Sequence, residues 1–302
     1  MTKHILITGA SGLIGTRLTE LLLKRGYAVS HVGRSRRIDK VQSFVWDVAK
    51  HVIEPGAFKG VTTIVHLAGA GVAERRWSVG RKKEILESRT KSSNLLYDEL
   101  KKGHHQVGSV ISASAIGYYG ISDNEIVYTE ESPPGNDFLA DVTRQWEESV
   151  DKIRSLGIRV AKLRIGIVLS DKGGTLKELE KPIKMLAGAP LGSGKQQVSW
   201  VHIDDVCGMF IKAIEDDSMS GVYNAVGPYP VTNKELTKEL ARVLKKPLIL
   251  PNIPGFILKL VVGPMAEIVL TGSKVSSEKI QKAGYIIQYQ TLQQALTNLY
   301  KK

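Results

Sequence analysis

The feature that most constrains the fold of this chain is a regular alternation of two patterns through its first 170 residues. Short apolar runs bounded by glycine are typical of buried strands, and apolar residues three and four positions apart indicate amphipathic helices. The alternation predicts an α/β fold in which helices cover both faces of a doubly wound parallel sheet. We expect strands at residues 4–9, 27–34, 62–70, 108–117 and 159–170, and helices at residues 16–26, 83–102 and 141–157.

The pattern changes after residue 170. Glycine-rich loops surround a short helix, a helix at 203–216 and a strand at 221–228 follow, and the tail is largely helical with interspersed prolines. We therefore expect a sheet domain and a smaller, mostly helical C-terminal lobe. The sheet domain would comprise residues 1–170 and 201–227, and the lobe residues 171–200 and 228–302.

Three glycines lie between the first expected strand and the first expected helix. Gly9, Gly12 and Gly15 form the pattern G-x-x-G-x-x-G. Such a loop lets the backbone approach a diphosphate, and the N-terminus of the following helix supplies free N–H groups and a positive dipole end. Short glycine patterns recur by chance, but this one stands where the mechanism requires it. It predicts a Rossmann-type dinucleotide-binding domain, with an ordinary turn as the alternative.

The second expected strand ends in basic residues. Arg34, Arg36 and Arg37 follow it, and no carboxylate occurs before Asp39. Domains that prefer NAD usually place an acidic residue here for the ribose hydroxyls, whereas arginine pairs with the 2′-phosphate of NADP. The sequence therefore predicts NADP(H) as cofactor, with a solvated basic turn as the alternative.

The net charge of +12 raises the question of nucleic acid binding. The basic residues are spread among acidic ones, as in RKKEILESRTK, and we find neither a zinc finger nor an aromatic–basic ribonucleoprotein motif. We favour a solvated basic surface and expect no nucleic acid partner, with nucleic acid binding as a minor alternative.

Composition and hydropathy also limit the class of protein. A single cysteine, Cys207, excludes an internal disulfide, and seven histidines without paired spacing predict no metal site. The most apolar stretch, residues 253–270, is interrupted by two prolines, a lysine and a glutamate, and is too broken for a membrane span of roughly 20 residues. The N-terminus lacks the apolar run of a signal peptide. We expect a cytoplasmic protein with a small-molecule substrate and no membrane partner.

Several longer motifs carry a resemblance to a known family. ITGASGLIG, WDV and HLAGA are similar to the fingerprint of the short-chain dehydrogenase/reductase superfamily. Together with AERRWSVGRKKEILESR, SASAIGYYG, GSGKQQVSWVHIDDV and GPMAEIVLTGSKVSSEKIQKAGY, they resemble its atypical extended group, the epimerase-family or sugar-nucleotide epimerase-like proteins. The resemblance covers nearly the whole chain and is specific for family, but much less so for reaction.

The resemblance implies which residues would hold the cofactor. Two of them, Glu84 and Arg89, have an alternative interpretation as a surface salt-bridge pair. The implied residues are Gly9, Ser11, Gly12, Leu13, Ile14 and Gly15 at the diphosphate; Gly33 and Arg34 at the adenosine ribose and its phosphate; Asp47 and Val48 beside the adenine; Leu67, Ala68 and Gly69 beneath the adenosine and bridging ribose; Glu84 and Arg89 on the following helix; and Val168 at the nicotinamide end.

The usual catalytic pair of the superfamily is absent. Its members use a tyrosine with a lysine four residues on, but here Phe138 or Leu139 occupies the neighbourhood of the tyrosine and Thr143 that of the lysine. The superfamily's serine has a candidate in Ser114, with Ser112 as the next choice and a merely structural hydroxyl as the alternative.

A nearby tyrosine could replace the missing acid. Tyr118 is our candidate, with Tyr119 and simple ring packing as alternatives. A phenol with a pKa of about 10 is a slow base at neutral pH, but it can donate a proton to a developing alkoxide, which favours reduction.

The C-terminal lobe offers candidate substrate residues. Lys195 lies among glycines in a cationic loop that suits a phosphate or carboxylate, and Gln196 and Trp200 could contact a polar ligand. The alternative is a solvated loop. His202 and Asp205 are expected to orient this loop and to cap the next helix.

These observations predict an NADP(H)-dependent oxidoreductase or epimerase that acts on a small polar substrate, with a nucleotide sugar as the candidate implied by the resemblance. The missing tyrosine–lysine pair leaves open a non-catalytic NADP(H)-binding sensor or scaffold. The sequence does not determine the substrate, the direction of reaction or the oligomeric state.

Overall fold

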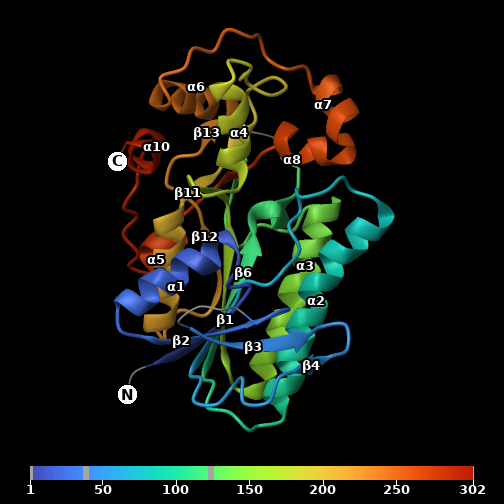
Figure 1. Ribbon diagram of the computed structural model, residues 1–302, viewed down its shortest axis with the longest axis vertical. Coiled ribbons are helices and arrows are strands. Elements are labelled where there is room, and N and C mark those ends of the chain that lie inside the picture. Colours follow the sequence, from blue (N-terminus) through green and yellow to red (C-terminus); the bar gives the residue numbers. More distant parts are fainter. Residues whose placement is uncertain (1–2, 37–40, 122–125, 302) are drawn as a thin grey trace.

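A sheet of eight strands forms the centre of the computed structural model, which describes residues 3–36, 41–121 and 126–301 (Figure 1). Neighbouring strands are parallel except β3 and β4, which form an antiparallel pair at one edge. The predicted doubly wound, mostly parallel sheet is therefore confirmed. The strands, in sheet order, are β12 (Gly221–Ala225), β8 (Arg159–Ile165), β6 (Ser109–Ala115), β5 (Thr63–His66), β1 (His4–Thr8), β2 (Ala28–Gly33), β3 (Gln42–Asp47) and β4 (Val52–Ile53).

Four long helices cover the two faces of this sheet. Helices α1 (Leu13–Lys24) and α5 (Ile203–Glu215) lie on one face, and α2 (Val79–Lys101) and α3 (Phe138–Asp151) pack together on the other (Figure 1). Polar side chains cap the N-termini of α2 and α3. Ser78 accepts a hydrogen bond from the N–H of Arg81, and Asp137 accepts hydrogen bonds from the N–H groups of Leu139 and Ala140.

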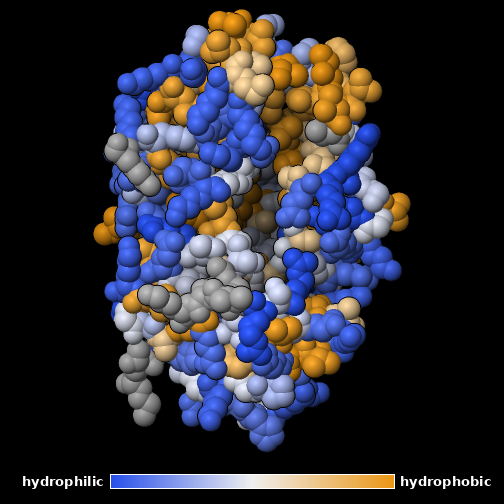
Figure 2. Space-filling model, in the orientation of Figure 1, coloured by the Kyte–Doolittle hydropathy of each residue, from blue (hydrophilic) through white to orange (hydrophobic). Residues whose placement is uncertain are grey.

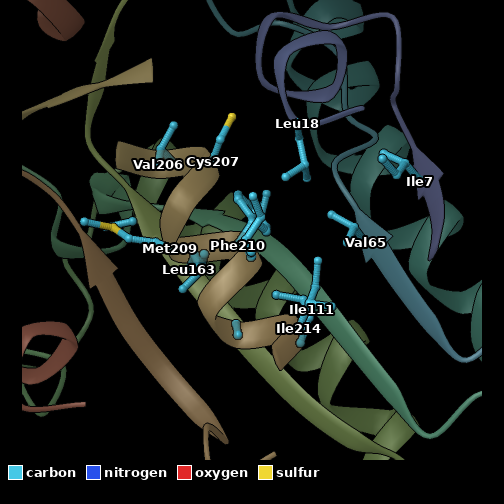
Figure 3. Packing of buried hydrophobic residues seen from close by; sticks show 14 of the residues in the cluster. Ile7, Leu18, Val65, Ile111, Leu163, Val206, Cys207, Met209, Phe210 and Ile214 are labelled. Atoms are coloured by element: carbon cyan, nitrogen blue, oxygen red, sulfur yellow. The ribbon is translucent and has the colours of Figure 1, made fainter. Parts of the chain in front are cut away.

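One part of the hydrophobic core lies between α5 and the sheet. Figure 3 shows Leu18 of α1, Val65 of β5 and Ile111 of β6 gathered with Phe210 of α5. All four side chains are fully buried. Burial of each contributes roughly 1.5–3 kcal/mol to stability, so this cluster holds α1 and α5 firmly on their face.

The predicted strand at residues 159–170 is interrupted at Gly166. β8 ends at Ile165. After Gly166 the chain forms β9 (Ile167–Leu169), which leaves the central sheet and pairs with β11 (Trp200–His202). A Cβ atom on Gly166 would collide with the carbonyl oxygen of Ser199. Glycine is therefore required where the two strands separate, and Val168 is carried away from the sheet.

Shorter elements gather beyond the carboxyl ends of the strands, where α4, α6, α7 and α8 lie together in Figure 1. One hydrophobic cluster includes Leu176 of α4 and Leu240 of α6 as well as Ile5 of β1. The division into two parts therefore stays a prediction. The shorter elements are β7 (Val127–Tyr128), α4 (Thr175–Lys184), β10 (Gln197–Val198), β13 (Val231–Thr232), α6 (Asn233–Val243), α7 (Gly255–Val262), α8 (Ala266–Leu270), β14 (Lys274–Val275), α9 (Glu278–Lys282), α10 (Leu292–Tyr300) and the 3-10 turns η1 (Ile116–Tyr119), η2 (Lys152–Leu156) and η3 (Gly263–Met265).

His202 and Asp205 have different structural roles. The ring Nδ1 of His202 accepts from the N–H of Asp204, so His202 caps α5 as expected. Asp205 does not cap the helix; its buried carboxylate accepts from the Tyr285 hydroxyl and from the N–H groups of Gln288 and Tyr289. Asp205 thus fastens the segment between α9 and α10 to the sheet domain.

Among the described residues, no helix is both long and apolar enough to cross a membrane.

Candidate cofactor and active site

Two of the three loop glycines are required by close packing. Gly9 has φ +68°, and a Cβ there would lie 2.8 Å from the carbonyl carbon of Leu67. A Cβ on Gly15 would lie 2.6 Å from the carbonyl oxygen of Gly9. These glycines let the first loop touch the backbone that follows β5 and let α1 pack closely against the loop.

Gly12 is less tightly packed than the other two glycines. It is exposed, its φ is −73°, and a Cβ there would lie 3.3 Å from the carbonyl oxygen of Gly9, which would have to shift slightly to admit it. Gly12 is also the N-cap of α1, with no side-chain cap and no acidic residue in the first turn. The first N–H groups of α1 therefore face open space, as a diphosphate site requires.

A buried polar network supports this loop from below. The Thr8 hydroxyl accepts from the N–H groups of Leu67 and Ala68, at 3.1 and 3.2 Å, and lies 2.8 Å from Nδ1 of His66. Nε2 of His66 lies 3.2 Å from the Ser93 hydroxyl. Burial, followed by the charge of Arg89, lowers the pKa of His66 to about 3, so its ring is neutral. The network holds the ends of β1 and β5 at a fixed distance.

The arginines after β2 point to different partners. Arg36 pairs with Glu54 at 2.5 Å and donates to the carbonyl of Ser43, so it is directed toward the β3–β4 edge. Arg34, which follows Gly33, is exposed and makes no ion pair within the described part of the chain. Arg37 lies outside the described residues. Of the two described arginines, Arg34 is the one available to a ligand.

The residues predicted beside the adenine follow β3. Asp47 accepts from the N–H groups of Ala49 and Lys50, both at 3.0 Å, and so closes a turn at the carboxyl end of that strand. Val48 is half-buried within this turn. Both residues lie at the same edge of the sheet as Gly33.

Glu84 and Arg89 do not pair with each other. Glu84 binds the buried guanidinium of Arg81 at 2.7 Å, and this bond, with further attraction from Arg75 and Arg34, lowers the pKa of the Glu84 carboxyl. The alternative of a surface Glu84–Arg89 pair is therefore wrong.

Arg89 occupies the space between the loop after β5 and α3. It donates to the carbonyls of Ala70 and Ile85, its guanidinium lies 5.1 Å from the ring of Trp146, and Gly69 packs on it. No carboxylate among the described residues pairs with it. Burial, followed by the charge of Arg81, lowers the pKa of Arg89 to about 10, so its guanidinium is still a cation at neutral pH.

Ser114 is part of a buried ionic network. It is 3% exposed and donates its hydroxyl proton to Glu147 of α3 at 2.6 Å. Arg164 of β8 makes a two-pronged pair with the same carboxylate, at 2.8 and 3.0 Å. Ser112, the next choice, donates to the adjacent carbonyl of Ala113. Both serine hydroxyls therefore already donate their hydrogen bonds within the protein.

The two tyrosines of η1 differ in the state of their hydroxyls. Tyr119 is buried, donates to Asn224 at 2.6 Å and accepts from Arg164, and burial raises its pKa. Tyr118 is half-buried, its ring lies 3.4 Å from the Arg164 guanidinium carbon, and its hydroxyl has no hydrogen-bond partner within the described residues. Tyr118 is the tyrosine whose hydroxyl is free.

Leu139 and Thr143 stand at the positions expected for the family's tyrosine and lysine. Leu139 faces η1 with an apolar side chain, and Thr143 faces it with a hydroxyl that is already hydrogen-bonded. A Cβ on Gly117 would lie 3.5 Å from Leu139 and 3.7 Å from the Thr143 hydroxyl. That hydroxyl donates to the carbonyl of Leu139. Phe138 and Leu139 also pack on Trp77 in a small apolar cluster. No proton donor for a substrate comes from these positions of α3.

The predicted substrate residues separate into exposed and buried ones. Lys195 is exposed, whereas Gln196 is 5% exposed and donates to the carbonyls of Leu191 and Val269. Trp200 is 1% exposed, and its indole N–H is donated to Tyr229. The last two are built into the interior, so of the three only Lys195 can meet a ligand in this conformation.

Figure 2 shows a hollow in the middle of this face, with hydrophobic residues in its depth and above it and hydrophilic residues on its two sides. Beside the N-terminus of α1, a cavity of about 470 Å³ is lined by Ser11, Leu13 and residues 170–173, among others. The loop that follows Val168 therefore borders the glycine loop, which brings Val168 close to the expected cofactor site.

Sequence reasoning missed five side chains that shape this region: Thr8, His66, Arg81, Glu147 and Arg164. Three of them are polar residues at the carboxyl ends of otherwise apolar strands, which is a usable signal in retrospect. No group of three or more His, Cys, Asp or Glu that could hold a metal occurs among the described residues.

Comparison with known proteins identifies relatives over the whole chain. A family model described as the NAD dependent epimerase/dehydratase family matches residues 5–226, and a domain of unknown function, DUF1731, matches residues 253–299. The "epimerase family protein SDR39U1 homolog, chloroplastic" of Arabidopsis thaliana is 36% identical over 96% of this chain and 84% of its own length.

Solved structures agree with this comparison. The human epimerase family protein SDR39U1, crystallised with NADPH, has 29% identity and a TM-score of 0.88, and 99% of each chain is covered. A nucleoside-diphosphate sugar epimerase from Corynebacterium glutamicum also has 29% identity, with a TM-score of 0.81 over 99% of this chain and 58% of its own.

Substitutions at two glycines should separate binding from packing. Gly12→Val would fill the space before α1, so we expect NADPH affinity, measured by calorimetry, to fall at least roughly tenfold while the free energy of unfolding falls by only about 1 kcal/mol. Gly15→Ala should instead destabilise the fold by roughly 1–3 kcal/mol, because its Cβ would strike the Gly9 carbonyl. Unchanged NADPH affinity in Gly12→Val would contradict the proposed diphosphate site.

The neutral His66 predicts a pH-dependent stability. Its pKa is about 3 when folded against 6.5 when unfolded, so below pH 6.5 the unfolded chain takes up a proton that the folded chain does not. As pH falls from 6.5 toward 3, this residue should lower the free energy of unfolding by about 1.4 kcal/mol per pH unit. Urea titrations between pH 4 and 7 should show a shallower dependence in His66→Gln, and identical slopes would exclude this role.

Proposed function

This chain belongs to the NAD dependent epimerase/dehydratase family, as its resemblance to epimerase-family proteins predicted, and on that premise we propose that it is an NADP(H)-dependent oxidoreductase or epimerase. The observation that carries the proposal is the open N-terminus of α1 at Gly12. Packing accounts for the glycines at positions 9 and 15, whereas the constraint at Gly12 is milder, and a ligand lying against the backbone would account for an uncapped, exposed glycine there.

The preference for NADP(H) is supported by Arg34. The guanidinium is exposed, unpaired among the described residues and located directly after β2, where a 2′-phosphate is bound in dinucleotide folds. The human relative was crystallised with NADPH. Within this proposal, Asp47 and Val48 flank the adenine, Leu67, Ala68 and Gly69 lie beneath the ribose, and Arg89 supplies a positive charge.

The bound cofactor would supply or accept a hydride, and the chain would supply the proton. Tyr118 is the proposed proton donor because its hydroxyl is free and its ring is held by the Arg164 guanidinium. The Ser114 hydroxyl already donates a hydrogen bond to Glu147, so it can only accept a hydrogen bond from a substrate. Donation by a tyrosine without a neighbouring lysine favours the reductive direction.

The proposed substrate is small, polar and anionic. Lys195 is exposed on a glycine-containing loop. Its ammonium group would bind the phosphate or carboxylate of the substrate. A nucleotide sugar is the leading candidate, since the relative from Corynebacterium glutamicum is described as a nucleoside-diphosphate sugar epimerase.

A second candidate function is NADP(H) binding without catalysis. The observation that favours it is the pair Leu139 and Thr143, which stand where the family's acid and its lysine are expected and cannot exchange a proton with a substrate. A sensor or scaffold would need the cofactor site alone.

Arg34→Ala tests the preference for NADP(H). Loss of a charged hydrogen bond to the 2′-phosphate should weaken NADPH binding by roughly tenfold or more and change NADH binding by less than about twofold. Calorimetry on protein freed of carried-over nucleotide measures both affinities. Arg36→Ala is the matched control, because Arg36 already pairs with Glu54. Equal losses for both nucleotides would remove Arg34 from the phosphate site.

Tyr118→Phe tests the chemistry. In assays of NADPH oxidation with a panel of nucleotide sugars and small ketones, turnover should fall by roughly 10²–10⁴-fold, with NADPH affinity unchanged. Ser114→Ala should lower turnover less and should lower stability, because Glu147 loses a buried donor. Full activity in Tyr118→Phe would exclude the tyrosine, and no turnover by the wild type across the panel would favour the non-catalytic function.

A further inference from the structure

Helix α7 presents most of its apolar side chains to solvent. Phe256 and Leu260 are 73% and 78% exposed, Ile257 and Val261 are also exposed, and no side chain described in this helix is buried. The other side of the helix packs on α8, since a Cβ on Gly255 would lie 3.4 Å from a side chain of that helix. Soluble proteins rarely gather large apolar side chains in water, so this face indicates a binding surface.

The exposed apolar residues of α7 share one side of the helix. At about 100° per residue, positions 256, 257, 260 and 261 fall within about 140° around the axis. Two more exposed apolar residues, Ile249 and Leu250, lie in the segment that leads into α7. Figure 2 shows hydrophobic residues gathered over the top of the molecule, where this segment and α7 lie in Figure 1. We call these six residues the α7 surface.

Only positive charge accompanies the α7 surface in the sequence. Residues 244–262 contain Lys245, Lys246 and Lys259 but no aspartate or glutamate. All three lysines are exposed, and none forms an ion pair within the described part of the chain. Lys259 stands on α7 itself, about 60° around the axis from Phe256, so it borders the apolar side chains. An apolar face bordered by unpaired lysines is complementary to an apolar layer that lies beneath anionic groups.

The charges and side-chain types distinguish between possible occupants. A second copy of the chain on the same surface would bring three lysines from each copy together with no carboxylate of this segment to offset them, which opposes a symmetric dimer. Protein interfaces are enriched in tyrosine, tryptophan and arginine and depleted in lysine, whereas this surface combines aliphatic side chains, one phenylalanine and lysines. That composition is typical of helices that lie in the interface of a membrane.

We propose that the α7 surface binds the face of a membrane that carries anionic phospholipids. The helix has eight residues and is about 12 Å long, too short to span a bilayer but able to lie in its interface. The expected absence of a membrane partner rested on the lack of a spanning segment, which holds for the described residues. The inference is independent of the proposed function, because no proposed cofactor or substrate residue belongs to the α7 surface.

Co-sedimentation of the full chain with vesicles tests the proposal. The probes are vesicles of phosphatidylcholine alone and of equal parts phosphatidylcholine and phosphatidylglycerol. We expect the wild type to partition into the anionic vesicles at least roughly tenfold more strongly than into the neutral ones, and less strongly as salt is raised. Phe256→Ser/Leu260→Ser should lower partitioning into anionic vesicles by roughly tenfold or more, because these apolar side chains no longer enter the acyl boundary.

Matched controls separate this surface from the rest of the molecule. Ile286→Ser should leave partitioning within about twofold of wild type, because Ile286 is 81% exposed but follows α9, outside the α7 surface. Lys245→Gln/Lys246→Gln should weaken binding to anionic vesicles by roughly tenfold. Lys24→Gln/Lys59→Gln, which removes two exposed lysines elsewhere, should change it by less than about twofold.

Three results would overturn the proposal. Wild-type chain that does not sediment with anionic vesicles would leave the α7 surface to a protein partner. Equal partitioning of Phe256→Ser/Leu260→Ser and wild type would mean that the net charge of +12 alone attracts the chain to the vesicles. A wild-type dimer in analytical ultracentrifugation that this double variant abolishes would assign the surface to a second copy. Leu260→Ser replaces the double variant if urea titration shows that the double variant is less stable than wild type.

Discussion

The close approach of two backbone segments is the contact on which the rest of the site depends. The loop at Gly9 touches the backbone at Leu67 and Ala68 so closely that no side chain fits between them. Thr8 and the neutral His66 hold the two segments together by hydrogen bonds to backbone and side chain. Since β1 is hydrogen-bonded to both β2 and β5, this contact directs the start of α1 into the crevice where the strand order reverses.

A second constraint is the buried charge network centred on Glu147. Its carboxylate is satisfied by Ser114 from β6 and by Arg164 from β8, which also orders both tyrosines of η1. A buried carboxylate with such partners is expensive to disturb, so this wall of the site is rigid. On α3, the Thr143 hydroxyl is engaged by the carbonyl of Leu139, whereas on η1 the Tyr118 hydroxyl has no hydrogen-bond partner among the described residues.

The charges around the expected cofactor are arranged by the same principle. Arg36 is bound by Glu54 and Arg81 by two glutamates, whereas Arg34 and Arg89 have no carboxylate partner among the described residues. The paired arginines maintain the structure around them, and the unpaired ones are available to an anionic ligand.

The sequence by itself determined the sheet, its helices and the glycine loop, because these depend on hydrophobic periodicity and on glycine spacing within a few residues. It also placed Arg34 correctly at the end of β2. Only the tertiary structure decided that Ser114 donates to Glu147, that Trp200 is buried, and that Tyr119 is engaged while Tyr118 has no hydrogen-bond partner among the described residues. The physical reason is distance along the chain: Ser114 and Glu147 are 33 residues apart and Tyr119 and Arg164 are 45 apart, so no local pattern encodes which polar groups burial forces to pair.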